Sequence, residues 1–158
     1  MEAVIRRYKG IGSEALATVD LMRYSIRQVI QSLTNHDVGP DEFQIVGFDD
    51  WNISYCMSLT DAYRLKDYVE SECDSDEYLV KYLLKKGWSV SAIISRRFSF
   101  VNGGDRKILE ALFEGRSTKY IADLVYTSGS AKEIILGFMS TGKVVLTPKG
   151  YYISSYCD

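Results

Sequence analysis

The chain has 158 residues, 46% of them hydrophobic, and its 19 basic and 21 acidic side chains give a formal net charge of −2. This length suits one compact domain or two small ones, and the near-balance of charge excludes a strong attraction of the whole chain to nucleic acid. One histidine and three cysteines without metal-finger spacing exclude an ordinary zinc site, and the absence of a signal-peptide pattern or a membrane-length apolar run predicts a cytoplasmic protein with no membrane partner.

The first fifty-seven residues predict a strand, a long helix and a hairpin. Residues 3–8 favour a short strand, and Ser13 is suited to cap the helix that follows. Apolar residues spaced four and three apart predict one amphipathic helix over residues 14–34. They are Ala15, Val19, Met22, Ile26, Val29 and Leu33. Residues 43–48 and 51–57, joined through Asp49-Asp50, are rich in β-forming residues and predict a hairpin.

Two further helices and a strand are predicted before residue 101. Thr60 is suited to cap a helix ending near Cys73, and the pattern of residues 77–86 predicts the next helix. Residues 88–101 read as a strand. The resulting order β-α-β-β-α-β is that of the ferredoxin-like arrangement, an α/β sandwich. Since Asn102-Gly103-Gly104 has the composition of a linker, we predict an N-terminal domain over residues 1–101 and a second domain over residues 105–158.

Three short helices and a hairpin are predicted in the second domain. Asp105 and Ser117 are suited to begin the helices over residues 106–114 and 118–125, and a third helix over residues 131–139 ends before Gly142. Residues 143–146 and 151–154 predict a closing hairpin around a turn at residues 147–150. Six apolar side chains are expected to share one core. They are Ile108, Leu112, Ile121, Leu124, Ile134 and Phe138.

This pattern resembles the winged helix-turn-helix superfamily over about a third of the chain. The residues that carry the resemblance are Ile108-Leu109-x-x-Leu112-x-x-Gly115-x-Ser117-x-x-x-Ile121-Ala122-x-x-Val125, Ile134-Ile135-x-x-Phe138 and Gly142-Lys143-Val144. The small Ala122 is expected to let another helix approach closely. Compact helix-turn-helix proteins commonly have a glycine four positions later, where this chain has Tyr126. The resemblance implies an α+β protein with a C-terminal winged-helix module.

In winged-helix modules the third helix enters the major groove and the hairpin contacts the DNA backbone. The resemblance therefore implies a DNA-binding transcription regulator whose partner is double-stranded DNA. Carried over by position, the DNA-binding residues are Arg116, Lys119, Thr127, Ser128, Ser130, Lys132, Lys143 and Lys149. Glu133 and Ser140 also belong to the groove-facing side. An alternative stays open, because a third helix poor in Arg, Asn and Gln also suits an adaptor whose winged helix binds a protein partner.

Two features of the N-terminal part allow alternative interpretations. The stripe over residues 14–34 either packs on its own sheet or, as three heptads, pairs with a second copy in a homodimer. In a ferredoxin-like sheet, Arg6, Arg7 and Lys9 would neighbour Arg96 and Arg97. That basic face either stacks single-stranded bases or keeps an exposed sheet edge soluble.

Motifs of enzymatic chemistry are absent from the sequence. There is no Gly-rich phosphate loop, no HExxH pair and no nucleophile elbow. The acidic clusters Asp49-Asp50 and Asp74-x-Asp76-Glu77 fall in predicted turns, where aspartate is common. We therefore predict a protein that is not an enzyme, with no catalytic residues and no metal or cofactor.

Overall fold

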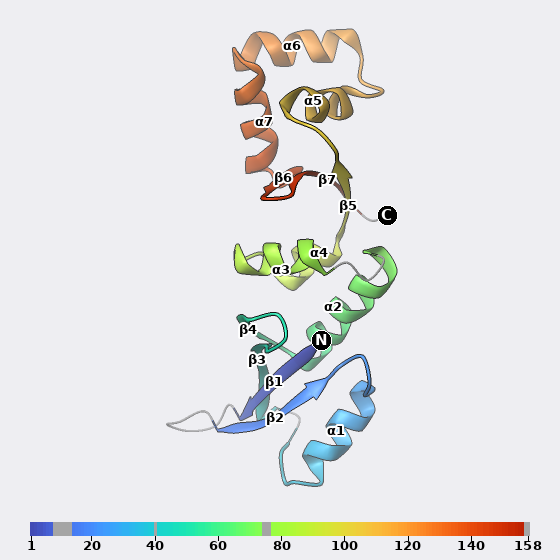
Figure 1. The fold of residues 1–158 in the computed structure, drawn as a ribbon, viewed down its shortest axis with the longest axis vertical. Coiled ribbons are helices and arrows are strands. Elements are labelled where there is room, and N and C mark those ends of the chain that lie inside the picture. The colour runs from blue at the N-terminus through green and yellow to red at the C-terminus, as the bar shows by residue number, and fades with distance from the viewer. Residues whose placement is uncertain (8–13, 40, 74–76, 157–158) are drawn as a thin grey trace. The chain divides into compact units, whose positions relative to one another are not determined.

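A computed structural model describes residues 1–7, 14–39, 41–73 and 77–156. Within these residues the protein is of the mixed α+β type, with seven helices and two antiparallel sheets (Figure 1). The chain divides into two compact units, Met1–Ile94 and Ser95–Asp158. Each unit has its own sheet and is described by itself.

A four-stranded sheet with the order β2-β1-β3-β4 forms the first part of the N-terminal unit. Its strands are β1 (Glu2–Arg7), β2 (Ala15–Asp20), β3 (Phe43–Phe48) and β4 (Ile53–Met57). Alternate side chains of the central strands, among them Ala3, Ile5 and Ile45, are completely buried, as expected of a sheet with one face in the core. The predicted hairpin over residues 43–57 is confirmed.

Four helices complete this unit. They are α1 (Ile26–Thr34), α2 (Leu59–Glu72), α3 (Tyr78–Lys85) and α4 (Val90–Ile94). Helix α1 begins at a capping box, in which the Ser25 side chain accepts a hydrogen bond from the Gln28 N–H while the Gln28 side chain accepts one from the Ser25 N–H. Ser58, and not the predicted Thr60, caps α2. Helix α2 packs against α1, α4 and β3.

The predicted helix over residues 14–34 is wrong in its first half. Residues Ala15–Asp20 form β2, and their backbone pairs with β1 in the register Val19↔Ala3 and Ala17↔Ile5. Ala17 and Val19 also satisfy the period of two that a strand requires, so the apolar spacing fitted both structures. The capping box at Ser25 then starts the helix a turn after the strand ends.

The ferredoxin-like order is also wrong. Two strands precede the first helix, and three helices lie between β4 and the next strand. The predicted strand over residues 88–101 is helical over Val90–Ile94 and becomes a strand only at Arg96. That strand, β5 (Arg96–Val101), pairs with the C-terminal β7 (Gly150–Tyr156) and so belongs to the second unit, whereas the sequence analysis placed it in the first domain.

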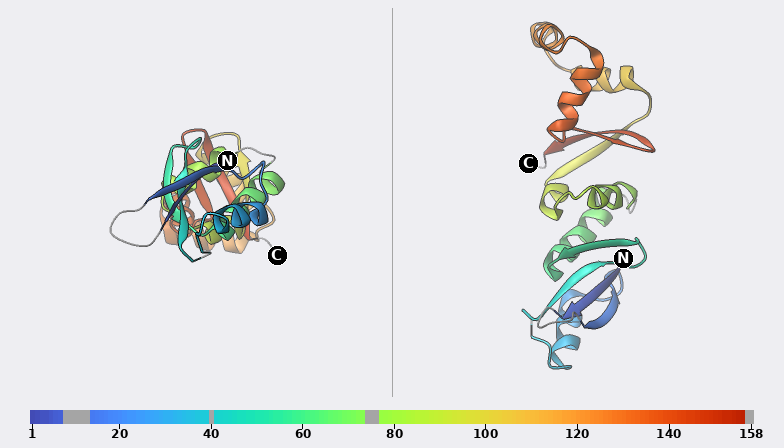
Figure 2. Two further views of the ribbon diagram at one scale, coloured as in Figure 1. Left: turned by 90° about the horizontal axis from the view of Figure 1, so that it is seen from below. Right: turned by 90° about the vertical axis from the view of Figure 1, so that its left-hand side faces the viewer.

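In the C-terminal unit three successive helices are followed by a hairpin, in the predicted order. The helices are α5 (Asp105–Phe113), α6 (Thr118–Ser128) and α7 (Ala131–Ser140), and the hairpin joins β6 (Val144–Thr147) to β7. Strand β5 adds a third strand, which gives the sheet order β5-β7-β6. The helices lie on one side of this sheet (Figure 2).

The core of the C-terminal unit is formed by α5, α7 and the sheet. Ile108, Leu112, Ile135 and Val144 are buried in one cluster, and Phe138 packs against it with several half-buried neighbours. Ile134 is buried as predicted.

Helix α6 contributes less to this core than the sequence analysis expected. It has no buried residue, and Ile121 and Leu124 are half-buried. Ala122 is exposed and so does not mediate a close helix approach. The prediction of a six-residue shared core is therefore wrong for α6, because this helix packs mainly against α7 and presents most of its circumference to solvent.

Candidate nucleic-acid interface

Charge is distributed unequally between the two units. Residues 1–94 contain ten Lys and Arg against fifteen Asp and Glu, whereas residues 95–158 contain nine against six. The formal charges are therefore −5 and +3. The sequence-based boundary gave the weaker contrast of −3 and +1, because it assigned Arg96 and Arg97 to the first domain. A positive unit joined to a negative one is the charge pattern expected if only the C-terminal unit contacts phosphates.

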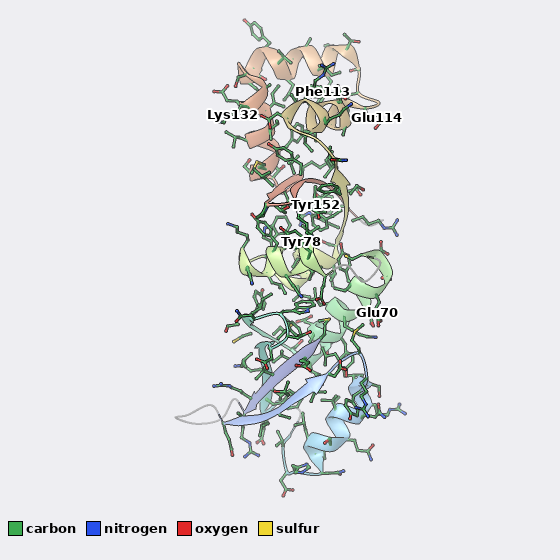
Figure 3. All side chains as sticks on the ribbon, viewed as in Figure 1. Glu70, Tyr78, Phe113, Glu114, Lys132 and Tyr152 are labelled. Carbon is green, nitrogen blue, oxygen red and sulfur yellow. The ribbon has the colours of Figure 1, made fainter. Side chains whose placement is uncertain are left out.

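Helix α7 occupies the position of the third helix in the predicted module. Ser130 caps it by accepting a hydrogen bond from the Glu133 N–H at 3.2 Å, and Ile134 and Ile135 fix its inner face in the core. Its outer face consists of exposed residues. They are Lys132, Glu133, Leu136, Gly137 and Ser140. Lys132 lies on the outer side of the helix near its beginning (Figure 3), where a cation can reach a phosphate.

Three predicted hydroxyl residues lie at the corner between α6 and α7. The hydroxyl of Thr127 donates to the carbonyl oxygen of Asp123 at 2.9 Å and also approaches that of Leu124. The Ser130 oxygen is engaged as the cap, although its own proton remains able to donate. Ser128 is half-buried at the end of α6. Local bonding therefore leaves this corner fewer hydrogen-bonding groups for DNA than the sequence suggested.

At the other end of α6, two predicted cations are exposed. The Arg116 guanidinium lies over the ring of Tyr120, with 5.6 Å between the guanidinium carbon and the ring centroid. This stacking orients the guanidinium while leaving its N–H groups at the surface. Lys119 is exposed in the first turn of α6. Both residues are suited to hold a phosphate backbone.

The two lysines of the hairpin have different environments. The Lys143 ammonium donates to the backbone carbonyl of Ser154, the Ser154 N–H donates to the Lys143 carbonyl at 2.8 Å, and the Ser154 hydroxyl donates to the Gly142 carbonyl at 2.8 Å. These bonds tie the end of α7 to β7 and hold Lys143 half-buried. Lys149 is exposed at the β6–β7 turn, where its N–H donates to the Thr147 hydroxyl at 3.1 Å. Lys149 is therefore the better placed of the two for a phosphate contact.

Two cations of α5 share one acidic neighbour. Arg106 and Lys107 both bond to Glu110, at 3.0 and 2.6 Å. The hydrogen bonds from Lys107 and then Arg106 lower the pKa of the Glu110 carboxyl. One carboxylate neutralises only one of the two positive charges, so these three side chains together keep a net charge of +1.

Sequence reasoning missed the arginines of β5 as members of this unit. The Arg96 guanidinium donates to the Tyr156 hydroxyl at 3.1 Å and lies 4.9 Å from the centroid of that ring. Arg97 is exposed on the same strand. The alternation of Phe98 and Phe100 with polar residues signalled an amphipathic strand, but its partner was not evident from the sequence.

The predicted basic sheet face is not formed. Arg6 and Arg7 belong to β1 in the first sheet, whereas Arg96 and Arg97 belong to β5 in the second. Lys9 lies outside the described residues.

Neither a metal cluster nor a membrane helix is found in the part of the chain that the structure describes. No group of three or more His, Cys, Asp and Glu side chains there is arranged to hold a metal ion. None of the described helices has both the length and the apolar character needed to span a bilayer.

Comparison with known proteins identifies no relative: no protein-family model, curated protein or solved structure matches this chain.

Proposed function

We propose that the protein is a DNA-binding regulator whose C-terminal unit contacts duplex DNA in the manner of a winged helix. The observation that carries the proposal is the separation of charge, +3 in residues 95–158 against −5 in residues 1–94. The succession of three helices and a hairpin supports the same function, because in winged-helix modules the third helix enters a groove and the hairpin contacts the DNA backbone. In this chain those elements would be α7 and the β6–β7 turn.

The chemistry of the surface favours phosphate contacts over base reading. Exposed Lys119 and Lys132 on the helices and Lys149 on the hairpin are suited to neutralise phosphates. The outer face of α7 has no Arg, Asn or Gln, the residues that read base edges with two hydrogen bonds. We therefore propose binding to duplex DNA with modest sequence selectivity, strongly dependent on salt.

The test is a fluorescence-anisotropy titration of mixed-sequence duplex DNA with the full chain at several salt concentrations. The logarithm of the binding constant should fall linearly with the logarithm of salt concentration, at about −0.9 per phosphate contact. Lys119→Ala, Lys132→Ala and Lys149→Ala should each weaken binding and reduce the magnitude of this slope by roughly one contact.

Lys85→Ala is the matched control, because Lys85 is an exposed helical lysine in the acidic unit. It should leave both affinity and slope unchanged. Loss of affinity in this variant equal to that in Lys132→Ala would show that the positive unit has no special role. Absence of binding at the lowest salt would reject DNA binding altogether.

A second candidate function is supported by the apolar side chains on the surface of α6 and α7. Leu136, at the centre of the outer face of α7, is 51% exposed, and on α6 Val125 is 50% and Tyr126 is 92% exposed. Exposed apolar groups of this kind are typical of protein-binding surfaces. An adaptor that binds a protein partner through α6 and α7 would show no DNA binding at low salt, and this outcome of the titration distinguishes the two candidates.

A further inference from the structure

Strand β2 forms one edge of the N-terminal sheet, and its sequence does not protect that edge. In the sheet order β2-β1-β3-β4, only β1 pairs with β2 among the described residues. Exposed edges are usually blocked by lysine, proline or an inward-pointing charge. From Ala15 to Val19 the strand has none of these, because its residues are Ala, Leu, Ala, Thr and Val. An edge of this kind is competent to pair with another strand.

The hydrogen-bonding phase of β2 shows which backbone groups point outward. The Leu21 N–H donates to the Met1 carbonyl at 2.9 Å, and the register pairs Val19 with Ala3 and Ala17 with Ile5. In an antiparallel sheet, successive residues direct their backbone N–H and C=O groups alternately toward the strand on one side and the strand on the other. The groups of Ala17 and Val19 face β1, so the N–H and C=O of Thr18, which lies between them, point away from β1. Thr18 is also exposed, so another strand can reach it.

A groove lies beside this edge, between β2 and α1. It has a volume of about 350 Å³ and is lined by uncharged residues. They are Ala17, Thr18, Val19, Tyr24, Gln28, Val29, Ser32 and Leu33. The apolar floor of the groove comes from Val29 and Leu33, which are buried, and from the inward-facing side chains of β2. A strand added to β2 would therefore gain backbone hydrogen bonds and apolar contacts together.

We propose that the edge strand β2 pairs antiparallel with β2 of a second copy of this chain, so that the two sheets join into one continuous sheet of eight strands. With the two-fold axis at Thr18, each Thr18 N–H meets the Thr18 carbonyl of the other copy. In each copy the N–H and C=O of Thr18 point away from its own β1, so this register lets the two Thr18 residues bond to each other.

The side chains of β2 itself allow a second copy in this role. The pairing brings no like charges face to face, because Asp20 of one copy lies opposite Leu16 of the other. The Asp20 carboxylate is also compensated within its own chain by the Met1 ammonium, at 3.7 Å. On the groove side, Ala17 and Val19 of the added strand offer small apolar side chains to a small uncharged groove. The strand is thus complementary to itself.

The experiment is sedimentation velocity of the full chain over a wide range of concentration. The unmodified chain should approach twice its mass of 17.9 kDa as concentration rises. Thr18→Lys places two ammonium groups opposite each other at the axis, and should weaken association by roughly tenfold or more. Thr18→Val retains the pairing and should keep the dimer.

Thr34→Lys is the matched charge control, because Thr34 is an exposed threonine of α1 that does not line the groove. It should dimerise like the unmodified chain. A monomer at every concentration, or a Thr18→Lys variant that still dimerises, overturns the proposal. If Thr18→Lys fails to fold, amide exchange of the unmodified chain decides: the Thr18 amide must exchange more slowly as concentration rises, and an unchanged rate overturns the proposal. None of these readouts involves DNA, so the result is independent of the proposed function.

Discussion

At the scale of single residues, Tyr151 and Asp105 connect the last strand to the first helix of the C-terminal unit. The Tyr151 hydroxyl donates to the Asp105 carboxylate at 2.7 Å. This hydrogen bond, with smaller effects of burial and of the carboxylate charge, raises the pKa of Tyr151 above 10.0. The bond joins residues 46 positions apart and so stabilises β7 against α5.

Asp105→Asn should lower the pKa of Tyr151 toward 10.0, because the negative acceptor that favours the protonated phenol is removed. The folded state holds this proton more tightly than the unfolded chain. The bond therefore contributes its full stability below about pH 10, and that contribution is lost as pH rises through the pKa of the folded state. An NMR titration of labelled tyrosine rings, with Tyr151→Phe to assign the resonance, measures the shift. An unchanged midpoint in Asp105→Asn would contradict the assignment of the cause.

In the N-terminal unit, a buried indole depends on one carboxylate. Trp51 is buried beside Phe48, and its Nε1 donates to the Glu77 carboxylate at 2.7 Å. Lys81 pairs with the same carboxylate and lies over the Trp51 ring. The three side chains attach α3 to the turn between β3 and β4.

Glu77→Ala should lower the free energy of unfolding by about 1–3 kcal/mol, because the buried indole N–H loses its acceptor. Urea denaturation followed by tryptophan fluorescence measures the change. Glu70→Ala is the control, since Glu70 pairs with Lys66 near the surface and such pairs contribute about 0–1 kcal/mol. Equal losses in the two variants would show that the indole bond is not the important contact.

At the scale of elements, the β3–β4 hairpin depends on a glycine. A Cβ atom on Gly47 would lie 2.0 Å from the carbonyl oxygen of Ile53. The register of the hairpin shifts between Ile45 and Gly47, so the backbones approach closely at this point.

Gly47→Ala should therefore destabilise the protein by about 3 kcal/mol or more, because a backbone oxygen must move. Gly137→Ala in α7 is the opposite case, since nothing beyond the adjacent residues and the backbone of its own helix lies within 4 Å of the added methyl group. It should stabilise the protein by about 0.5–1 kcal/mol through helix propensity. Thermal denaturation of both variants tests the pair, and a Gly47→Ala variant as stable as the unmodified chain would contradict the close approach.

The helices and strands that could be predicted well from the sequence are those with clear local signals, such as a capping serine and a terminating glycine. Helix α7 was located correctly because Ser130 caps it and Gly142 follows it. Helix α6 begins at the predicted Ser117 cap, but the prediction ended it at residue 125, and it continues through Ser128 to Gly129. The first helix was misplaced because its apolar spacing also fits a strand, and the pairing of β2 with β1 decided the outcome. The exposure of α6 depends on which other elements of the fold cover it, and the spacing of apolar residues in its sequence does not carry that information. In the candidate site, the half-buried state of Lys143 depends on Ser154, eleven residues away across the hairpin.

At the scale of the whole molecule, the two units have separate cores, and tryptophan fluorescence follows the unfolding of only one of them. Both tryptophans, Trp51 and Trp88, belong to Met1–Ile94, whereas Ile108 is completely buried in the core of the C-terminal unit. Ile108→Ala should cost that unit about 2–5 kcal/mol. Far-ultraviolet circular dichroism should then show an earlier transition in urea, while the midpoint of tryptophan fluorescence stays unchanged. Equal shifts by both probes would mean that the units unfold together.

The pairing of β5 with β7 has a practical consequence for any attempt to express the C-terminal unit alone. A gene fragment starting at the glycines 103 and 104, where the sequence suggests a linker, would delete β5. The truncated product would present the backbone of β7, together with Tyr151 and Ile153, to solvent, and open strands of this kind promote aggregation. Cloning from Ser95 instead retains the third strand, and a soluble product from that start but not from the later one is the expected result.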